Sequence, residues 1–360
     1  MLVTTDRDEV IDLAPANRTL GGEALLATVS GEAISPFDLG PMSSWPLVRN
    51  VSDLTGGAID WGAGEGTCLP QPELVAAMRQ RGAGTFQIDR PRGPRGPFTA
   101  IRLDTDTGAT HADPTSLRLA EAAKLLSFDF DAMRVFDSAA SPTSDETRAL
   151  LNDWFSLLSR GVVVAATGSR SYVRDVETLG AVAGNGPFIT LKARTASAEA
   201  AMGETLASVG SGFELVVDVQ APTWMALDRI EVYAPIADGD VSCAQSTDPK
   251  AHPKSRVACN GASNSNWPAE GIAASMAITA ADVVLEKVGE KDGGVYQRAR
   301  VSKAFSFPAP ARDGWFVAAI YGAGTMRPVL GSTPFAITNP VFFDADGSGY
   351  DKPPAGKMGR

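Results

Sequence analysis

Charged side chains follow four apolar runs in the first half of the chain, each of which predicts a strand. The clusters are Thr5-Asp6-Arg7-Asp8-Glu9, Ser30-Gly31-Glu32, Gln87-Ile88-Asp89-Arg90 and the segment 166–173. In an α/β barrel the carboxyl ends of the strands meet at one face, where active sites are built. Four polar clusters at four predicted strand ends are more than chance would usually place there, so we expect a candidate site at this face.

A second acidic cluster, DADGSGYD, occupies residues 344–351. Asp344, Asp346 and Asp351 place oxygen donors around a glycine turn, an arrangement that suits a hard cation such as calcium. The segment lacks the third early acidic ligand and the distant bidentate Glu of an EF-hand. It therefore predicts either a calcium-binding turn or an acidic turn that ends the fold.

The two histidines, His111 and His252, lie in polar turns without ligand partners at useful spacing, so we expect both at the surface. Two histidines exclude a histidine-rich metal site, and they offer no Ser-His-Asp or Cys-His arrangement. No P-loop or dinucleotide fingerprint follows a strand. The loop RPRGPRGP, with Arg92 and Arg95, is typical of a solvated Pro/Gly turn, and a basic binding loop is the alternative.

Cys243 and Cys259 flank a polar segment rich in Pro, Lys and Ser. Such a segment is poorly able to hold itself by burial. A disulfide between the two cysteines is therefore one interpretation, and it would imply an oxidising compartment. Two unrelated thiols are the other.

The chain has 360 residues, 44% hydrophobic and 21% charged, which is typical of a soluble globular protein of two domains. Its net charge of −10 repels phosphate backbones, so we expect no nucleic-acid partner. No apolar run reaches the roughly 18 residues that span a bilayer. The start, MLVTTDRDEVIDLAP, shows no signal peptide and begins directly in a predicted strand, which suggests missing upstream sequence.

Short apolar runs alternate with helical patterns up to about residue 190, which indicates α/β architecture. We expect helices at 72–81, 115–126 and 144–160, the last of which begins at the capping residue Ser144 and ends before Gly161. Beyond about residue 205, short β-rich segments separated by turn residues predict a β-sandwich. An Ala- and Ser-rich segment at 190–212 is expected to bridge the two parts.

These segments resemble the PHP-domain metallohydrolases, specifically the CehA/McbA-like branch. The resemblance rests on TTDRD at 4–8, IDRPRG at 88–93, DWFSLLSRG at 153–161, AGNGPF at 183–188 and PFAITNPVFFDADGSG at 334–349. It implies a PHP-like distorted (βα)7 barrel at 1–200 without its first strand, a C-terminal β-sandwich at 205–345 and a tail at 346–360. Relatives are often exported, so a secreted or periplasmic location is implied as well.

The resemblance also implies a chemistry. Members of the family hold up to three divalent metals, such as zinc, manganese or iron, with His, Asp and Glu, and a metal-bound hydroxide attacks phosphoesters or related esters. In this chain the expected histidines fall on Arg7 and Arg90, and an expected acid falls on Arg134. The acids that the resemblance leaves in place are Asp6, Asp8 and Glu32, which are therefore the candidate catalytic residues of a remnant site. Arginine stays protonated and offers no lone pair to a metal, so we expect a hydrolase homologue without activity, a pseudoenzyme.

A hypothesis follows for the three arginines: they could replace the metals and neutralise Asp6, Asp8 and Glu32. The pocket would then bind a small anionic or ester ligand, with a carboxylate or phosphate group, without metal. A structural salt-bridge cluster is one alternative, and residual metal-dependent catalysis is another, because acids remain. A third makes the β-sandwich a surface for a protein partner and the barrel its scaffold.

Overall fold

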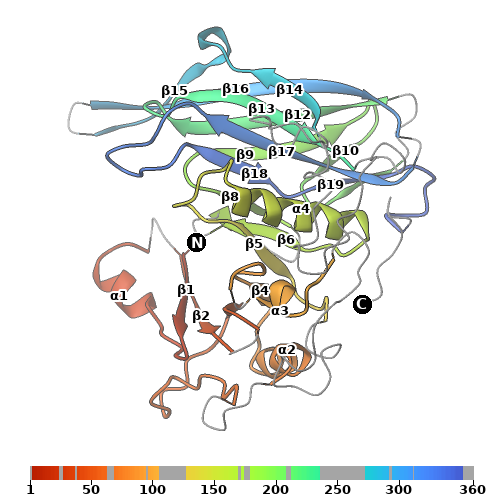
Figure 1. The fold of residues 1–360 in the computed structure, drawn as a ribbon. Helices are drawn as coiled ribbons and strands as arrows, with labels where there is room; N and C mark the ends of the chain where they lie inside the picture. The colour runs from red at the N-terminus through yellow and green to blue at the C-terminus, as the bar shows by residue number, and fades with distance from the viewer. Residues whose placement is uncertain are drawn as a thin grey trace. The chain divides into compact units, whose positions relative to one another are not determined.

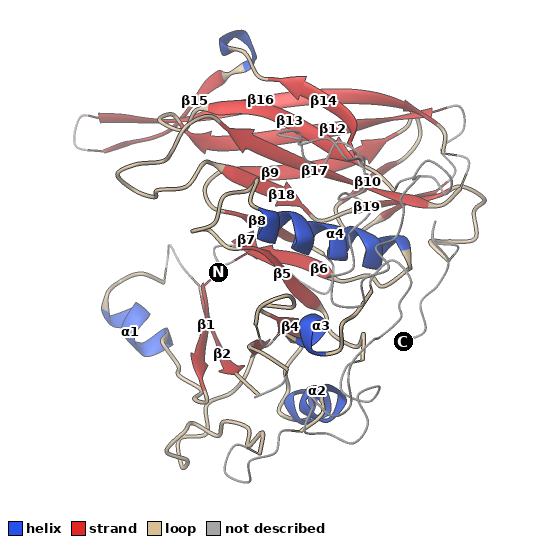
Figure 2. Ribbon diagram, viewed as in Figure 1, coloured by secondary structure: helices blue, strands red, loops and turns tan. Residues whose placement is uncertain are grey.

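The computed structural model describes residues 2–23, 27–36, 39–62, 69–94, 96–104, 127–168, 172–173, 179–207, 212–235, 272–291, 294–310 and 312–351. In these residues a mixed α/β region with parallel strand pairs is followed by largely antiparallel sheets (Figures 1 and 2). The chain forms two compact units that divide between Arg134 and Val135.

The first unit contains β1 (Leu2–Arg7), α1 (Ala14–Thr19), β2 (Thr28–Ile34), β3 (Met42–Trp45), α2 (Gln71–Gln80), β4 (Thr85–Ile88), α3 (Pro97–Ala100) and the start of β5 (Ala132–Phe136). Strand β1 pairs with β2 in parallel, β2 with β3 and β3 with β4 antiparallel, and β4 with β5 in parallel. The described strands thus form a mixed sheet in sequence order, and their closure into a barrel stays a prediction.

Helix α2 confirms the helix predicted at 72–81. Leu74, Val75 and Met78 recur at helical spacing, and all three are buried. Met78 Sδ lies 2.8 Å from Ser44 Oγ of β3, so α2 covers one side of the mixed sheet. The helix ends before Gly82, whose φ of +91° favours glycine over any other residue.

The second unit contains α4 (Asp145–Ser159), β6 (Ala165–Gly168), β7 (Tyr172–Val173), β8 (Ala181–Gly184), β9 (Phe188–Arg194), β10 (Glu199–Ala201), β11 (Thr205–Ala207), β12 (Gly212–Pro222), β13 (Leu227–Tyr233), β14 (Ile272–Ala277), a 3₁₀ turn (Ala280–Asp282), β15 (Val284–Lys291), β16 (Gly294–Pro308), β17 (Gly314–Gly322), β18 (Phe335–Thr338) and β19 (Val341–Asp344). One sheet has the order β10-β9-β12-β16-β15. In another, β11-β19-β17-β18-β8-β7 follow one another, and β13 links β17 to β14. These strands confirm the β-rich pattern beyond residue 205.

Strand β12 shows how the sequence forms the core of this unit. Phe213, Leu215, Val217 and Val219 alternate with more exposed residues and are buried, as the period of two along a strand requires. Buried apolar side chains from both sheets, such as Val217 of β12 and Ile320 of β17, belong to one hydrophobic core. Burial of this shared core stabilises the unit.

Helix α4 confirms the helix predicted at 144–160. Ser144 caps it by accepting a hydrogen bond from the Thr147 backbone N–H at 3.3 Å. Its apolar side includes Leu150, Trp154 and Leu157, all buried. A capping residue and an apolar stripe at helical spacing were sufficient to place this element.

The division between the units lies earlier than the boundary that the sequence predicts near residue 200. The reason is pairing that no local pattern shows: β8 pairs with β18, from near the other end of the unit. The segment 190–212, expected to be a bridge, instead contributes to β9, β10, β11 and the first residue of β12. Residues 135–184 therefore belong to the β-rich unit.

Asn339, fully buried between β18 and β19, ties two distant strands together. Its Oδ1 accepts from the Ala166 N–H at 2.7 Å, and its Nδ2 donates to the Ala166 carbonyl at 3.1 Å and to the Ala181 carbonyl at 2.8 Å. A buried side-chain amide thus satisfies backbone groups of both β6 and β8.

Candidate functional site

The predicted charged clusters lie at different places along their strands. Strand β1 continues to Arg7, so Asp6 and Arg7 lie within it and are exposed. Glu32 lies in the middle of β2 and is fully buried, whereas Asp89 directly follows β4 and is also buried. Arg90 is exposed in the turn that comes next.

Glu32 and Asp89 project from opposite sides of the mixed sheet. Side chains alternate along a strand, and residues paired across neighbouring strands share a side. Glu32 pairs with Ser44, whereas Gln87, two residues before Asp89, pairs with Ser43. Because Ser43 and Ser44 are consecutive, the two acids lie on different sides of the sheet.

The same register places the arginines. Arg7 pairs with Ala33, and Ala33 pairs with Ser43, so Arg7 lies on the side of Ser43. Arg134 lies on this side too, where its guanidinium reaches Asp89. We call this side, which carries Arg7, Ser43, Asp89 and Arg134, the arginine face, and the side covered by helix α2 the α2 face.

On the arginine face, Asp89 is held by three donors. Its Oδ1 lies 2.7 Å from Arg134 Nη2 and accepts from Gln87 Nε2 at 2.6 Å, while its Oδ2 accepts from Ser43 Oγ. The Asp89 side chain is 6% exposed and that of Arg134 25%. A buried carboxylate is tolerated when it is paired and hydrogen-bonded, and here both conditions are met.

On the α2 face, Glu32 has a different environment. Its two oxygens accept from the Ile59 N–H at 3.0 and 3.2 Å. Burial raises the pKa of Glu32 to about 7; the Ile59 hydrogen bond and the charge of Arg81 oppose this rise, and the charge of Asp8 adds to it. Asp8 accepts from Trp61 Nε1 at 2.7 Å. The Asp8 backbone N–H donates to the carbonyl of Ala33 at 2.9 Å, so Asp8 lies beside the residue that follows Glu32.

Asp6 pairs with Glu32 across β1 and β2 and so belongs to the α2 face. The predicted anion-binding arginines are Arg7, Arg90 and Arg134, and the predicted catalytic acids are Asp6, Asp8 and Glu32. Within the described ranges, no ion pair joins an arginine of the first set to an acid of the second. The acid that Arg134 neutralises is Asp89.

A metal of the kind that the resemblance implies does not fit these residues. Several side chains with lone pairs must converge on one point to hold such an ion, and arginine offers none. Glu32 and Asp89, the two buried acids among the described residues of the first unit, face away from each other across the sheet. In the described part of this unit, no three His, Cys, Asp or Glu side chains lie close enough to share an ion.

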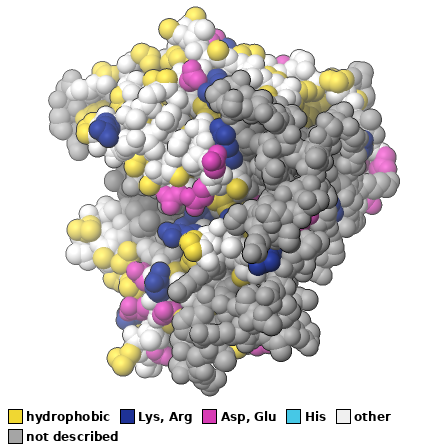
Figure 3. All heavy atoms as spheres, in the orientation of Figure 1, with side chains coloured by type: hydrophobic (Ala, Val, Ile, Leu, Met, Phe, Trp, Pro, Cys, Tyr) yellow, Lys and Arg dark blue, Asp and Glu magenta, His cyan; other side chains and the backbone are white. Residues whose placement is uncertain are grey.

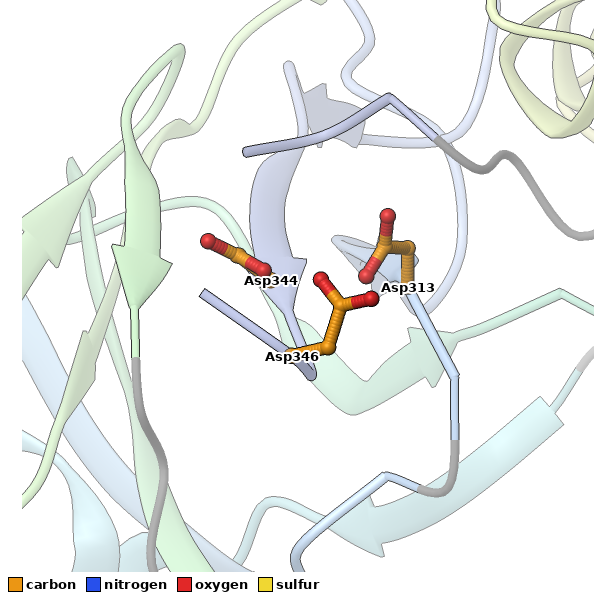
Figure 4. A group of neighbouring side chains, drawn as sticks. All are labelled: Asp313, Asp344 and Asp346. Carbon is orange, nitrogen blue, oxygen red and sulfur yellow. The ribbon is translucent and has the colours of Figure 1, made fainter. Parts of the chain in front are cut away.

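A group of acids in the second unit could hold an ion (Figure 4). Asp313 precedes β17, and Asp344 and Asp346 lie at and beyond the end of β19. One carboxylate oxygen from each lies within 4.8 Å of the others. Asp313 and Asp344 are buried and Asp346 is exposed, so an ion could reach the group from solvent.

This group overlaps the predicted calcium turn but differs in one residue. Asp351 Oδ1 accepts from Ser348 Oγ at 2.9 Å and stands outside the group. Asp313 takes its place because Gly314 pairs with Phe343, which brings Asp313 beside Asp344. No sequence motif links residues 31 positions apart, so only the strand register reveals the third acid.

A buried polar network in the second unit also has no motif in the sequence. Glu231 is 4% exposed; its Oε1 accepts from Arg229 Nε at 2.7 Å and its Oε2 accepts from the Tyr233 hydroxyl. The Tyr233 hydroxyl also lies 3.0 Å from that of Tyr321, whose ring lies beneath the Arg229 guanidinium at 4.3 Å. Burial raises the pKa of both tyrosines, so their hydroxyls stay protonated and can donate.

Several predictions lie outside the described residues. They concern the cysteine pair Cys243 and Cys259, the histidines His111 and His252, Arg95, the helix at 115–126, the cluster segment 169–171 and the tail beyond residue 351.

In the part of the chain that the structure describes, no helix is long and apolar enough to cross a membrane. Acidic and basic side chains lie interspersed among the described residues on the face drawn in Figure 3.

Comparisons with known proteins add no family to this picture. No family model matches the chain, no curated protein matches its sequence, and no solved structure matches its fold.

Proposed function

We propose that the first unit is a PHP-type hydrolase scaffold without metal-dependent hydrolysis, and that its arginine face binds a small anion. In this proposal the strands of the first unit belong to a distorted barrel, and the antiparallel sheets that follow form a β-sandwich. The observation that carries the proposal is the contact of Arg134 Nη2 with Asp89 Oδ1 at 2.7 Å. A fixed cation thus neutralises a buried acid at a strand end where the family would place a metal.

The charges of the arginine face support binding of an anion. Asp89 already neutralises Arg134, whereas Arg7 pairs with no acid within the described residues and so supplies the positive charge for an anion. Asp6 and Glu32, which would repel an anion, lie on the opposite side. Arg7 is exposed, and a guanidinium binds carboxylate or phosphate oxygens in pairs.

The small side chain of Ala33 in β2 also supports anion binding at the arginine face. Ala33 lies between Arg7 and Ser43 in one row across three strands, each about 4.8 Å from the next. Ala33 is partly exposed, and its methyl side chain extends less far from β2 than a longer side chain would, which favours a ligand beside Arg7.

The first test concerns metal and turnover. We expect purified protein, produced with manganese, zinc and iron present, to hold less than stoichiometric transition metal by elemental analysis. We also expect no chelator-sensitive hydrolysis when the protein is assayed with an aryl phosphodiester or an aryl ester. Stoichiometric metal, or turnover that disappears with chelator, would overturn the inactive scaffold.

The second test concerns the anion and uses inorganic phosphate as the probe. Phosphate should raise the melting temperature of the wild type and of Arg18→Gln, an exposed control with the same change in charge. It should not raise that of Arg7→Gln. Equal stabilisation of all three proteins would overturn binding at the arginine face while leaving the inactive scaffold untouched.

A further inference from the structure

The hairpin of β15 and β16 exposes an unusual share of apolar surface. Among the described residues, five of the twelve large exposed apolar side chains lie here, each more than half exposed: Val284, Leu285, Val288, Val295 and Tyr296. Strand β15 ends the order β10-β9-β12-β16-β15, so its outer edge pairs with no strand in the described part of the chain (Figure 2). Clustered apolar side chains on an open strand edge are typical of an interaction surface.

A ladder of alternating charge crosses the sheet toward this edge. Asp218 of β12 lies 3.2 Å from Arg300 of β16, and Arg300 lies 3.1 Å from Glu286 of β15. Glu286 also contacts Arg298 at 2.8 Å. The charges along this ladder therefore alternate from Asp218 to Arg300 to Glu286, and the last residue at the open edge is the acid Glu286. A basic side chain on a further strand would continue it.

Strand β15 can supply that basic side chain from a second copy of itself. We infer that β15 pairs antiparallel with β15 of a second chain, about a two-fold axis between Val288 and Gly289. In this register Glu286 faces Lys291 of the other copy, and Lys287 faces Glu290. By symmetry each pairing occurs twice, so four pairs of opposite charge cross the interface.

The bulge in β15 makes this register consistent on both sides of the sheet. Lys287 pairs with Gln297 and Glu290 with Val295, and the two partners are two residues apart on β16, so Lys287 and Glu290 share a side. Their contact within one chain agrees. Without the extra residue at the bulge, which lies between Lys287 and Gly289, these two charges would lie on opposite sides.

Two other placements of the axis bring like charges together. An axis through Lys287 sets two lysines opposite each other, and an axis through Glu290 sets two glutamates opposite each other. Lysines and bulges on an edge strand usually hinder pairing with other chains. Here like charges hinder the registers centred on Lys287 and Glu290, and opposite charges favour the register centred between Val288 and Gly289, so the charge pattern of this edge matches a second copy of itself.

The test is the oligomeric state of the full chain by sedimentation equilibrium, up to about 100 μM, a range in which weak homodimers are populated. We expect the wild type to dimerise. Lys287→Glu turns two attractive contacts per dimer into repulsive ones, so the dimer dissociation constant should rise by about tenfold or more. The double variant Lys287→Glu/Glu290→Lys exchanges the charges and should restore the dimer.

The control variant is Lys192→Glu, which breaks the exposed pair of Lys192 with Glu199 at the other end of the same sheet. It should dimerise as the wild type does, and circular dichroism should show all four proteins folded. A monomeric wild type would overturn the proposal. So would a dimer that Lys287→Glu leaves unchanged, or a double variant that stays as weak as the single one.

Discussion

Glu32 and Asp89, two buried acids of the first unit, point to opposite sides of one sheet. A single ligand cannot touch both carboxylates, because the backbone layer separates them. Asp89 has a permanent counter-charge in Arg134, whereas among the described residues Glu32 accepts hydrogen bonds from the backbone N–H of Ile59 and from no cation. The two acids therefore respond differently to substitution and to pH.

Removal of the Arg134 charge should destabilise the protein through Asp89. Arg134→Gln leaves a carboxylate that is 6% exposed without its cation, and we expect the free energy of unfolding to fall by about 2–3 kcal/mol. This is less than for a fully buried pair, since Arg134 is one-quarter exposed. Asp89→Asn/Arg134→Gln should recover at least about 1 kcal/mol relative to additivity in urea denaturation. Strict additivity of the two changes would contradict a coupled pair.

Glu32 should make the first unit less stable as pH rises. Its pKa is about 7 in the folded protein and 4.5 when unperturbed, so the folded state binds the additional proton between these values. The contribution of Glu32 to the free energy of unfolding is therefore greatest below pH 4.5. It falls by up to about 3 kcal/mol as pH rises through 7. Glu32→Gln should remove this dependence in denaturation curves measured from pH 5 to 8. An identical slope in the variant would assign the pH effect to another group.

Calcium should stabilise the second unit through Asp313 and Asp346. At ten times its dissociation constant, a bound ion adds about 1.4 kcal/mol to the free energy of unfolding. Calorimetry with calcium should show a higher melting temperature for the wild type and no change for Asp313→Asn. Asp344→Asn is a poor test because this carboxylate accepts from the backbone N–H groups of Gly347, Ser348 and Gly349. Equal shifts in wild type and Asp313→Asn would place any calcium elsewhere.

Glu231 should contribute more to stability than either tyrosine beside it. Glu231→Ala removes a carboxylate that accepts from both Arg229 and Tyr233, while Arg229 keeps its contact with Asp228, and we expect a loss of about 3 kcal/mol. Tyr321→Phe removes one hydroxyl contact and should cost about 1 kcal/mol. Guanidinium denaturation of the two variants gives the comparison. A smaller loss for Glu231→Ala than for Tyr321→Phe would show that the acid is not the centre of the network.

Local patterns predicted the elements, and strand register decided the sites. The cap at Ser144 and the apolar spacing of α2 were readable because a helix depends on neighbours three and four residues away. The separation of Glu32 from Asp89 depends on the pairing of β2 with β3 and of β3 with β4, and a shift of one residue would reverse it. Asp313 joined the acidic group for the same reason, through the pairing of β17 with β19.

The amide of Asn339 has a consequence for the order of events during synthesis. The backbone of Ala166 is translated 173 residues before the side chain that satisfies it. Until position 339 leaves the ribosome, strands β6 and β8 lack the side-chain amide that forms hydrogen bonds with both of them. We therefore expect the β-rich unit to reach its final state late in translation, in one step that joins its earliest and latest strands.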